Sequence, residues 1–301
     1  MCNGTNVTTS PTCKEVDYLS AVAYTPLFLL GLCLNVAALR TFIAIRASWK
    51  DTHVYMFNLN MADFALILFL PFRIYDALFC LPMGKWCTFL IFIHYINMYA
   101  SILTTTAISV HRFLTIRFPL QARSWRKKKE TAFAVCLVVW VLLVTSCAIF
   151  REENYPKNLW NCFERCKNRP LNLVFILIVT CLGFLTPLLI IVYCSHQIIT
   201  ILLKDDNRSE EKMSTIGIVT ANMAVFIFCY MPIHIGFLVN YYYKFPPDWQ
   251  EVRSPVHIYL LVCEWIASTN CCFDSISYYF LMRRYYSDAM KRVSLWFQLK
   301  S

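Results

Sequence analysis

Long apolar runs, separated by short polar segments, divide most of the chain. Each run is about 20 residues long, the length that an α-helix needs to cross a hydrocarbon layer of roughly 30 Å. The pattern predicts an all-α membrane protein, a bundle of seven membrane-spanning helices within residues 18–282. These helices are expected to begin near Tyr18, Val54, Trp86, Thr131, Leu171, Met213 and Val256.

The composition agrees with a lipid environment. Hydrophobic residues make up 58% of the 301 positions and charged residues only 15%, whereas a soluble domain carries about 25% charged residues. We therefore expect membrane lipids, and no nucleic acid, as partners of this chain.

The basic residues indicate which side of the bundle faces the cytoplasm, because short loops rich in Lys and Arg stay inside. Of the 28 Lys and Arg residues, 18 fall on one predicted side, in residues 40–51, 112–129, 204–212 and the tail after residue 281. This predicts a multi-pass plasma-membrane protein whose residues 1–17 are extracellular. Sequons at Asn3 and Asn6 fit glycosylation of that segment.

The last part of the chain has its own pattern. Within residues 283–301, apolar positions recur every three or four residues with Arg and Lys between them, at Tyr286, Met290, Val293 and Trp296. Such spacing predicts a short amphipathic helix in the cytoplasmic membrane interface.

Fifteen cysteines are present, and most lie inside apolar runs, where a thiol packs as a small hydrophobe. Six fall at outer positions or helix ends, in an oxidising compartment: Cys2, Cys13, Cys80, Cys87, Cys162 and Cys166. A Cys87–Cys162 bridge would hold the loop after the fourth helix over the bundle. Cys13 with Cys166 is a second candidate pair, and Cys2 or Cys80 could compete, because sequence alone does not fix connectivity.

The sequence gives little support for an enzyme, a transporter or a channel. Its six glycines are too far apart for a phosphate-binding loop, a nucleophile elbow or a potassium filter. Its six histidines show no metal-ligand spacing. We therefore expect no catalytic residues and no cofactor, apart from a sodium ion considered next.

Several polar residues fall inside the apolar runs, where each is costly and marks a candidate site. Four of them carry oxygen atoms that suit a small hard cation: Asp63, Ser101, Asn270 and Asp274. A sodium site is one interpretation of this set. A hydrogen-bonded polar core around a protonated acid is the other.

Motifs spread over nearly the whole chain resemble those of the rhodopsin-like (class A) G-protein-coupled receptors. They include Asn35, "LNMAD" around Asp63, Cys87, "HRF" at residues 111–113, Trp140, Pro187, "FIFCYMP" at residues 226–232 and "NCCFDSISYYF" at residues 270–280. The resemblance implies a heterotrimeric G protein as partner. It also implies that Arg112, at the cytoplasmic end of the third helix, moves between a resting contact and the G protein.

The chain departs from the family pattern at the expected switch. His111 replaces the acid that normally pairs with the arginine, Tyr230 replaces the usual tryptophan of the sixth helix, and Ser275 replaces a proline. Asp274 and Tyr278 keep the polar ends of the last motif. A weaker resting restraint on Arg112 is expected.

The ligand is expected to be a small anion. Amine receptors of the family carry an aspartate where this chain has His94, while cations lie near the outer ends of its helices. The expected pocket consists of Arg73, His94, Tyr95, Met98, Arg151 and His234. Cations with aromatic lining suit an anionic amphiphile or aryl acid, although Arg151 could instead reach the lipid headgroups.

Three segments, "NCCFDSISYYF", "FCYMPIHIGF" and "LTIRFPLQARSWR", are similar to a pair of related orphan receptors that respond to lysophosphatidylinositol and to kynurenic and other aryl acids. The resemblance thus predicts a receptor for a lysophospholipid or an aromatic carboxylic acid. A non-signalling scavenger receptor and an ion-conducting bundle are the alternatives.

Overall fold

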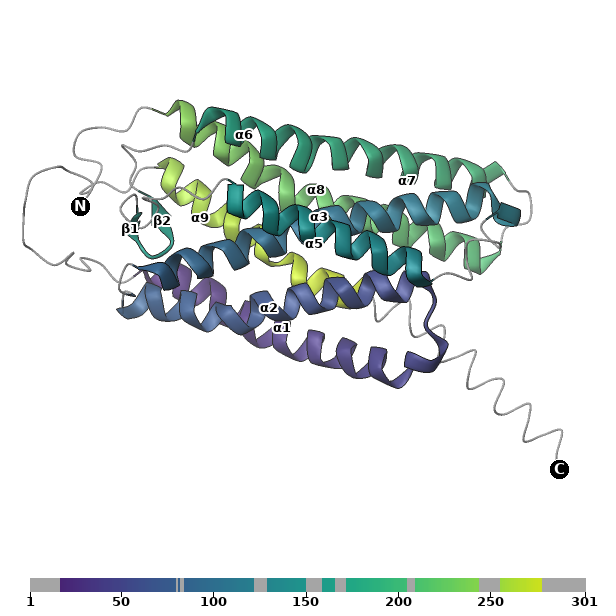
Figure 1. Cartoon of the computed structure of the whole chain (residues 1–301), viewed down its shortest axis with the longest axis horizontal. Coiled ribbons are helices and arrows are strands. Elements are labelled where there is room, and N and C mark those ends of the chain that lie inside the picture. The colour runs from purple at the N-terminus through teal and green to yellow at the C-terminus, as the bar shows by residue number, and fades with distance from the viewer. Residues whose placement is uncertain are drawn as a thin grey trace, which may run out of the picture.

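The computed structural model describes residues 17–79, 81, 84–121, 129–149, 159–165, 172–204, 209–243 and 255–277. Their helices form an elongated bundle (Figure 1). In chain order the elements are α1 (Tyr18–Ala44), η1 (Arg46–Ser48), α2 (Asp51–Phe79), α3 (Lys85–Arg117), α5 (Lys129–Ile149), β1 (Leu159–Asn161), β2 (Glu164–Arg165), α6 (Leu173–Thr180), η3 (Cys181–Leu185), α7 (Thr186–Lys204), α8 (Glu210–Tyr242) and α9 (Pro255–Ser268).

The seven spans expected from the apolar runs are confirmed. Six of them are long and apolar enough to cross a membrane by themselves, with α6, η3 and α7 forming one span and α9 continuing to Ser277. The seventh is α2, which is 29 residues long and includes Asp63 and Arg73. Each helix begins within three residues of its expected start.

Capping residues explain where several helices begin. The side chain of Asp17 accepts a hydrogen bond from the Ser20 amide at the start of α1, and Ser209 does the same for Lys212 at the start of α8. These bonds satisfy amides that have no partner inside the helix. In α8 the helix therefore begins in the polar sequence before the apolar run.

Two helices are irregular near their middle. η3 is a single π-helical turn, and Gly183 lies within it against the Tyr99 ring of α3. In the last span, the chain turns at Thr269 and is helical again over residues 270–277. Turns of this kind change the direction of the side chains that follow.

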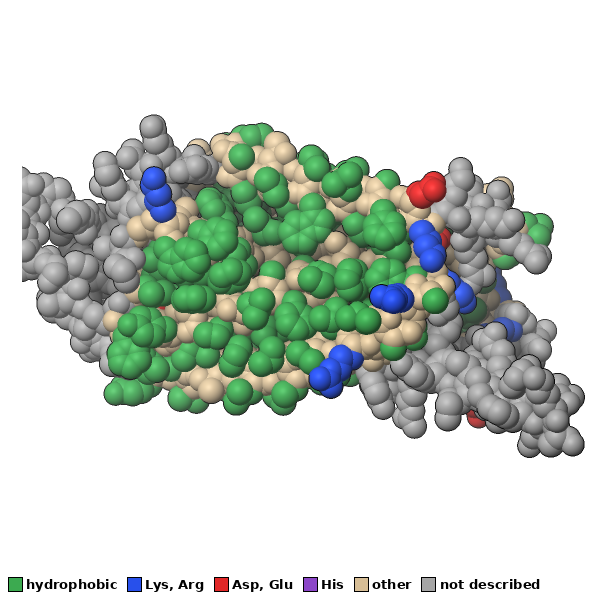
Figure 2. Space-filling model, turned by 60° about the horizontal axis from the view of Figure 1, so that its bottom comes forward, with side chains coloured by type: hydrophobic (Ala, Val, Ile, Leu, Met, Phe, Trp, Pro, Cys, Tyr) green, Lys and Arg blue, Asp and Glu red, His purple; other side chains and the backbone are tan. Residues whose placement is uncertain are grey.

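The surface of the bundle matches a lipid environment, with basic side chains gathered at one end. Hydrophobic side chains cover the middle of the face drawn in Figure 2, and most of its Lys and Arg side chains gather near one end. Exposed basic residues at the corresponding helix ends include Arg40, Arg46, Lys50, Arg117, Lys129 and Lys204. This asymmetry agrees with the orientation expected from the loops.

At the opposite end, a short hairpin is attached to the bundle. β1 and β2 pair antiparallel, and Cys162 in their turn forms a disulfide with Cys87 of α3. The expected bridge is confirmed. Residues 1–16 and 278–301 lie outside the described residues, as do Cys80 and Cys166. The predictions that fall on them are the two sequons, the disulfide partners of Cys2 and Cys13, the role of Tyr278 and the amphipathic helix.

Candidate functional site

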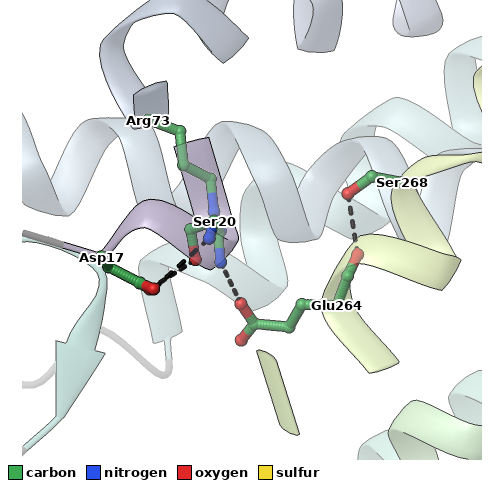
Figure 3. A network of polar contacts seen from close by, with 5 residues as sticks. All are labelled: Asp17, Ser20, Arg73, Glu264 and Ser268. Atoms are coloured by element: carbon green, nitrogen blue, oxygen red, sulfur yellow. Dashed lines mark hydrogen bonds and ion pairs between the residues drawn. The ribbon is translucent and has the colours of Figure 1, made fainter. Parts of the chain in front are cut away.

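The end of the bundle that carries the hairpin contains a buried ion pair. Arg73 of α2 donates from Nη2 to the Glu264 carboxylate of α9, and the side chains are only 8% and 15% exposed. Figure 3 shows the two side chains pointing toward each other from their helices. The expected ligand cation therefore already has an intramolecular partner.

Two aromatic rings complete the surroundings of Arg73. Its guanidinium carbon lies 4.7 Å from the centre of the Tyr24 ring and 4.9 Å from that of Phe163. Such cation–π contacts are attractive, and more so away from water. Phe163 follows Cys162, so the disulfide to α3 holds this ring over the arginine.

The other expected pocket residues of α3 lie close by but differ in their surroundings. His94 is buried and packs edge-on against Tyr95, with ring centres 5.5 Å apart. Met98 is buried one turn deeper, in an apolar cluster that includes Phe184, Phe226 and Tyr230. His94 and Tyr95 thus stay near the ion pair, whereas Met98 belongs to the floor beneath it.

His234 of α8 has both ring nitrogens engaged. Nδ1 lies 2.7 Å from the Tyr230 carbonyl oxygen and Nε2 lies 3.1 Å from the Tyr99 hydroxyl. A carbonyl can only accept, so Nδ1 donates its proton to Tyr230, and the Tyr99 hydroxyl, which can donate or accept, is the partner of Nε2. The ring also stacks on Phe184 at 4.3 Å, and His234 is therefore part of the packed core between three helices.

The polar residues expected for a cation site meet in the middle of the bundle. Asn97 donates to Asp63 Oδ1 at 3.5 Å, and Asn270 donates to Asp274 Oδ2 at 2.6 Å. Asp63 is fully buried, and its Oδ2 has no hydrogen-bond partner among the described residues; the same is true of Ser101 Oγ. Unpaired buried oxygens of this kind are the ligands that a small cation would take.

A second set of amides fixes the backbone around this centre. Asn35 of α1 donates to the carbonyl oxygens of Gly31 and Cys271, and it accepts from Asn60 of α2 at 2.9 Å. Nearby, Asn58 accepts from Trp140 at 2.8 Å and donates to Thr104 at 3.3 Å. These bonds tie α1, α2, α3, α5 and the last span together where lipid surrounds them.

A narrow cavity leads from the polar centre toward the basic end of the bundle. Its lining includes Arg112 of α3, Tyr230 and Asn222 of α8, and Asn270 and Asp274 of the last span. Within the described residues, no acid lies within 4.0 Å of the Arg112 guanidinium. The cavity thus joins the two groups of residues that the sequence suggested for switching and for cation binding.

The acid absent from position 111 has a counterpart on α2. His111 Nε2 lies 3.6 Å from Asp51 Oδ2, and the His111 ring packs 5.9 Å from Tyr55. Asp51 is the first residue of α2, where a carboxylate is favoured by the helix dipole. The Asp51 carboxylate therefore contacts His111, and Arg112 lines the cavity.

Two acids in the site were missed by sequence reasoning, and Arg151 lies outside the described residues. Glu264 is an ionisable residue within an apolar run, a signal that could have found it. Asp51 gave no such signal, because it falls in a polar loop of the sequence. Only the packing of α2 against α3 brings it to His111.

Comparison with known proteins gives a family for the chain. The model of the family "7 transmembrane receptor (rhodopsin family)" matches residues 34–278. G-protein coupled receptor 35 of Mus musculus is 33% identical over 263 residues, covering 86% of this chain and 83% of that protein. G-protein coupled receptor 55 of Mus musculus is 28% identical over 291 residues, covering 90% and 88%. Lysophosphatidic acid receptor 6 of Mus musculus is 32% identical over 280 residues, covering 85% and 78%.

Proposed function

Because the chain belongs to the rhodopsin family of seven-transmembrane receptors, we propose that it is a cell-surface receptor that binds a small anionic ligand and activates heterotrimeric G proteins. Membership implies a multi-pass plasma-membrane receptor with G-protein partners and a lipid or other small molecule as ligand. The finer proposals are an extracellular N-terminus and a ligand that is a lysophospholipid or an aromatic carboxylic acid.

Arg73 is the observation that carries the proposed ligand class. It is a buried guanidinium between two aromatic rings, and within the described residues Nη2 is its one nitrogen that donates a hydrogen bond. Arginine has five N–H donors in a fork that matches carboxylate and phosphate groups. The name of one relative, a lysophosphatidic acid receptor, agrees with a phosphate-bearing lipid.

Sodium is proposed as an allosteric ligand of the polar centre. The unpaired Asp63 Oδ2 and Ser101 Oγ, with oxygens of Asn270 and Asp274 nearby, fit a small hard cation. A bound sodium ion would supply positive charge beside Asp63, and these side chains would hold it. In this proposal, sodium binding and the movement of Arg112 are linked through the cavity between them.

The experiment is a screen of lysophospholipids and aromatic carboxylic acids against a panel of G-protein dissociation sensors. Arg73→Ala should then lower the potency of an active compound about tenfold to a hundredfold, because a charge-assisted contact is worth roughly 1.5–3 kcal/mol. Arg73→Lys should lower the potency less than Arg73→Ala does. Removing Arg73 also leaves Glu264 unpaired, so Arg73→Ala/Glu264→Gln serves as the matched variant, with surface expression measured for each. An unchanged potency in the double variant would refute a ligand role for Arg73.

A non-signalling scavenger receptor is the alternative function. The replacements at His111, Tyr230 and Ser275, all at switch positions of the family, favour it. Nucleotide exchange on purified G proteins separates the two functions, since a scavenger would bind its ligand without accelerating exchange.

A further inference from the structure

The Arg73–Glu264 pair connects the second and seventh spans across 191 positions of sequence. Either side chain alone would be costly at this depth, since a buried charge needs a partner. The pair therefore satisfies both charges while the site holds no ligand.

The pair satisfies Arg73 incompletely. Glu264 is bound through one carboxylate oxygen to Nη2, whereas carboxylates and phosphates often bind the guanidinium fork with two parallel hydrogen bonds. The guanidinium carbon lies over the Tyr24 and Phe163 rings, and the N–H donors of a guanidinium point outward in its own plane. An incoming anion must therefore bind at the edge of the guanidinium, which Glu264 partly occupies, and it can make a second bond there.

Glu264 can leave Arg73 without moving its helix. Ser268 donates to the Glu264 backbone carbonyl at 2.8 Å, and Trp265 donates to the Ala23 carbonyl of α1 at 2.9 Å. Both contacts hold α9 in place (Figure 3 shows the first), and within the described residues the Glu264 carboxylate has no hydrogen bond other than the one from Arg73. At 15% exposure, the carboxylate is also closer to solvent than Arg73 at 8%.

We infer that Glu264 is a specificity-determining residue of the ligand site: its carboxylate occupies Arg73 in the empty receptor, and the anionic group of the ligand binds by taking its place. This inference rests on the proposed function, an anion-binding receptor. It deepens that function by naming what the site selects. The Glu264 carboxylate repels every anion, so only anions that bind the guanidinium through two hydrogen bonds displace it. Neutralising Glu264 should strengthen anion binding selectively.

The nearby described charges do not change the sign of this effect. The Asp17 carboxylate accepts two hydrogen bonds from Ser20, one from the Ser20 backbone amide at 3.3 Å and one from the Ser20 hydroxyl at 2.6 Å. These bonds keep Asp17 at the cap of α1. Arg73 and Glu264 together carry no net charge. Removing the negative member leaves a guanidinium that attracts an anion without competition.

The experiment compares each acidic probe with a neutral analogue. Kynurenic acid is paired with its methyl ester, and oleoyl lysophosphatidic acid with oleoylglycerol. Binding is measured as the shift in thermal unfolding of the purified full-length receptor over a range of probe concentrations, and signalling as nucleotide exchange. The variants are Glu264→Gln, Glu264→Asp, Arg73→Gln and the double Arg73→Gln/Glu264→Gln. Glu130→Gln is the control, because it neutralises an exposed acid at the start of α5.

Glu264→Gln should bind the acidic probes about tenfold more tightly and the neutral probes unchanged. Glu264→Asp and Glu130→Gln should behave as the wild type. Both variants without Arg73 should lose the difference between acid and ester. A purely structural tether predicts something else, namely that Glu264→Gln weakens acidic and neutral probes alike.

Equal affinity of the wild type and Glu264→Gln for the acids would overturn the inference, as would an absence of binding by any acidic probe to Glu264→Gln. The two readouts keep the proposals separate. If the acids bind with the expected charge selectivity but never accelerate exchange, signalling is refuted and the role of Glu264 stands. If the acids accelerate exchange equally in both proteins, signalling stands and the role of Glu264 is refuted.

Discussion

Restoring an acid beside Arg112 tests how this receptor is held at rest. Among the described residues, no acid contacts Arg112, and the nearest acid to the motif, Asp51, contacts His111 at 3.6 Å. The described part of the chain therefore lacks the ion pair that raises the cost of activation in the family pattern. We expect ligand-independent nucleotide exchange above the background of membranes without receptor.

The informative substitution is His111→Asp, and the structure shows that it needs a partner substitution. A carboxylate at position 111 faces Arg112 and also Asp51. Two like charges about 5 Å apart repel by roughly 3 kcal/mol at an effective dielectric constant of about 20, and partial exposure of His111, 27%, reduces this to about 1–2 kcal/mol. His111→Asp alone should therefore change basal nucleotide exchange little, because the repulsion from Asp51 offsets the new attraction to Arg112.

The double variant His111→Asp/Asp51→Asn removes the repulsion and keeps the new ion pair. A restraint of about 1.4 kcal/mol lowers a rare active state about tenfold, so basal exchange should fall about tenfold relative to Asp51→Asn. The assay is nucleotide exchange on a panel of purified G proteins in membranes at matched receptor density. Equal basal rates in Asp51→Asn and the double variant would refute the reasoning, and so would negligible exchange in the wild type.

Two further results are expected. Gly183→Ala should lower the stability of the purified receptor by about 1–3 kcal/mol, because a Cβ there would lie 2.8 Å from the Tyr99 ring. Gly217→Ala is the control: a Cβ there would have nothing within 4 Å, so the thermal unfolding temperature should stay the same or rise. Equal losses of stability in both variants would contradict the packing argument. Sodium chloride should stabilise the wild type more than choline chloride does, and Asp63→Asn should abolish this difference; a wild type that is indifferent to sodium would rule out the cation site.

Much of the architecture could be predicted because the bilayer imposes simple rules on the sequence. A spanning helix needs an apolar run of defined length, so the starts of α1, α3 and α9 were expected within a residue of their observed positions. The Cys87–Cys162 bridge was the favoured pairing among several. The turn at Thr269 and the π-helical η3 were not expected, since no apolar pattern distinguishes them from a regular helix.

The site was predictable only as a set of residue types. Isolated polar residues in apolar runs gave Asp63, Asn270 and Asp274, because lipid makes each of them costly. Arg73 was expected from its place near the outer end of its helix.

The sequence alone determined which side chains must find partners. Tertiary packing decided the partner of each one. Arg73 meets Glu264, and His111 meets Asp51, because particular helix faces come together across long separations in sequence. His234 is part of the packed core for the same reason, since Tyr99 of another helix reaches its second ring nitrogen. Hydrogen bonds and ion pairs act over a few ångströms, and no periodicity along one chain specifies distances between its helices.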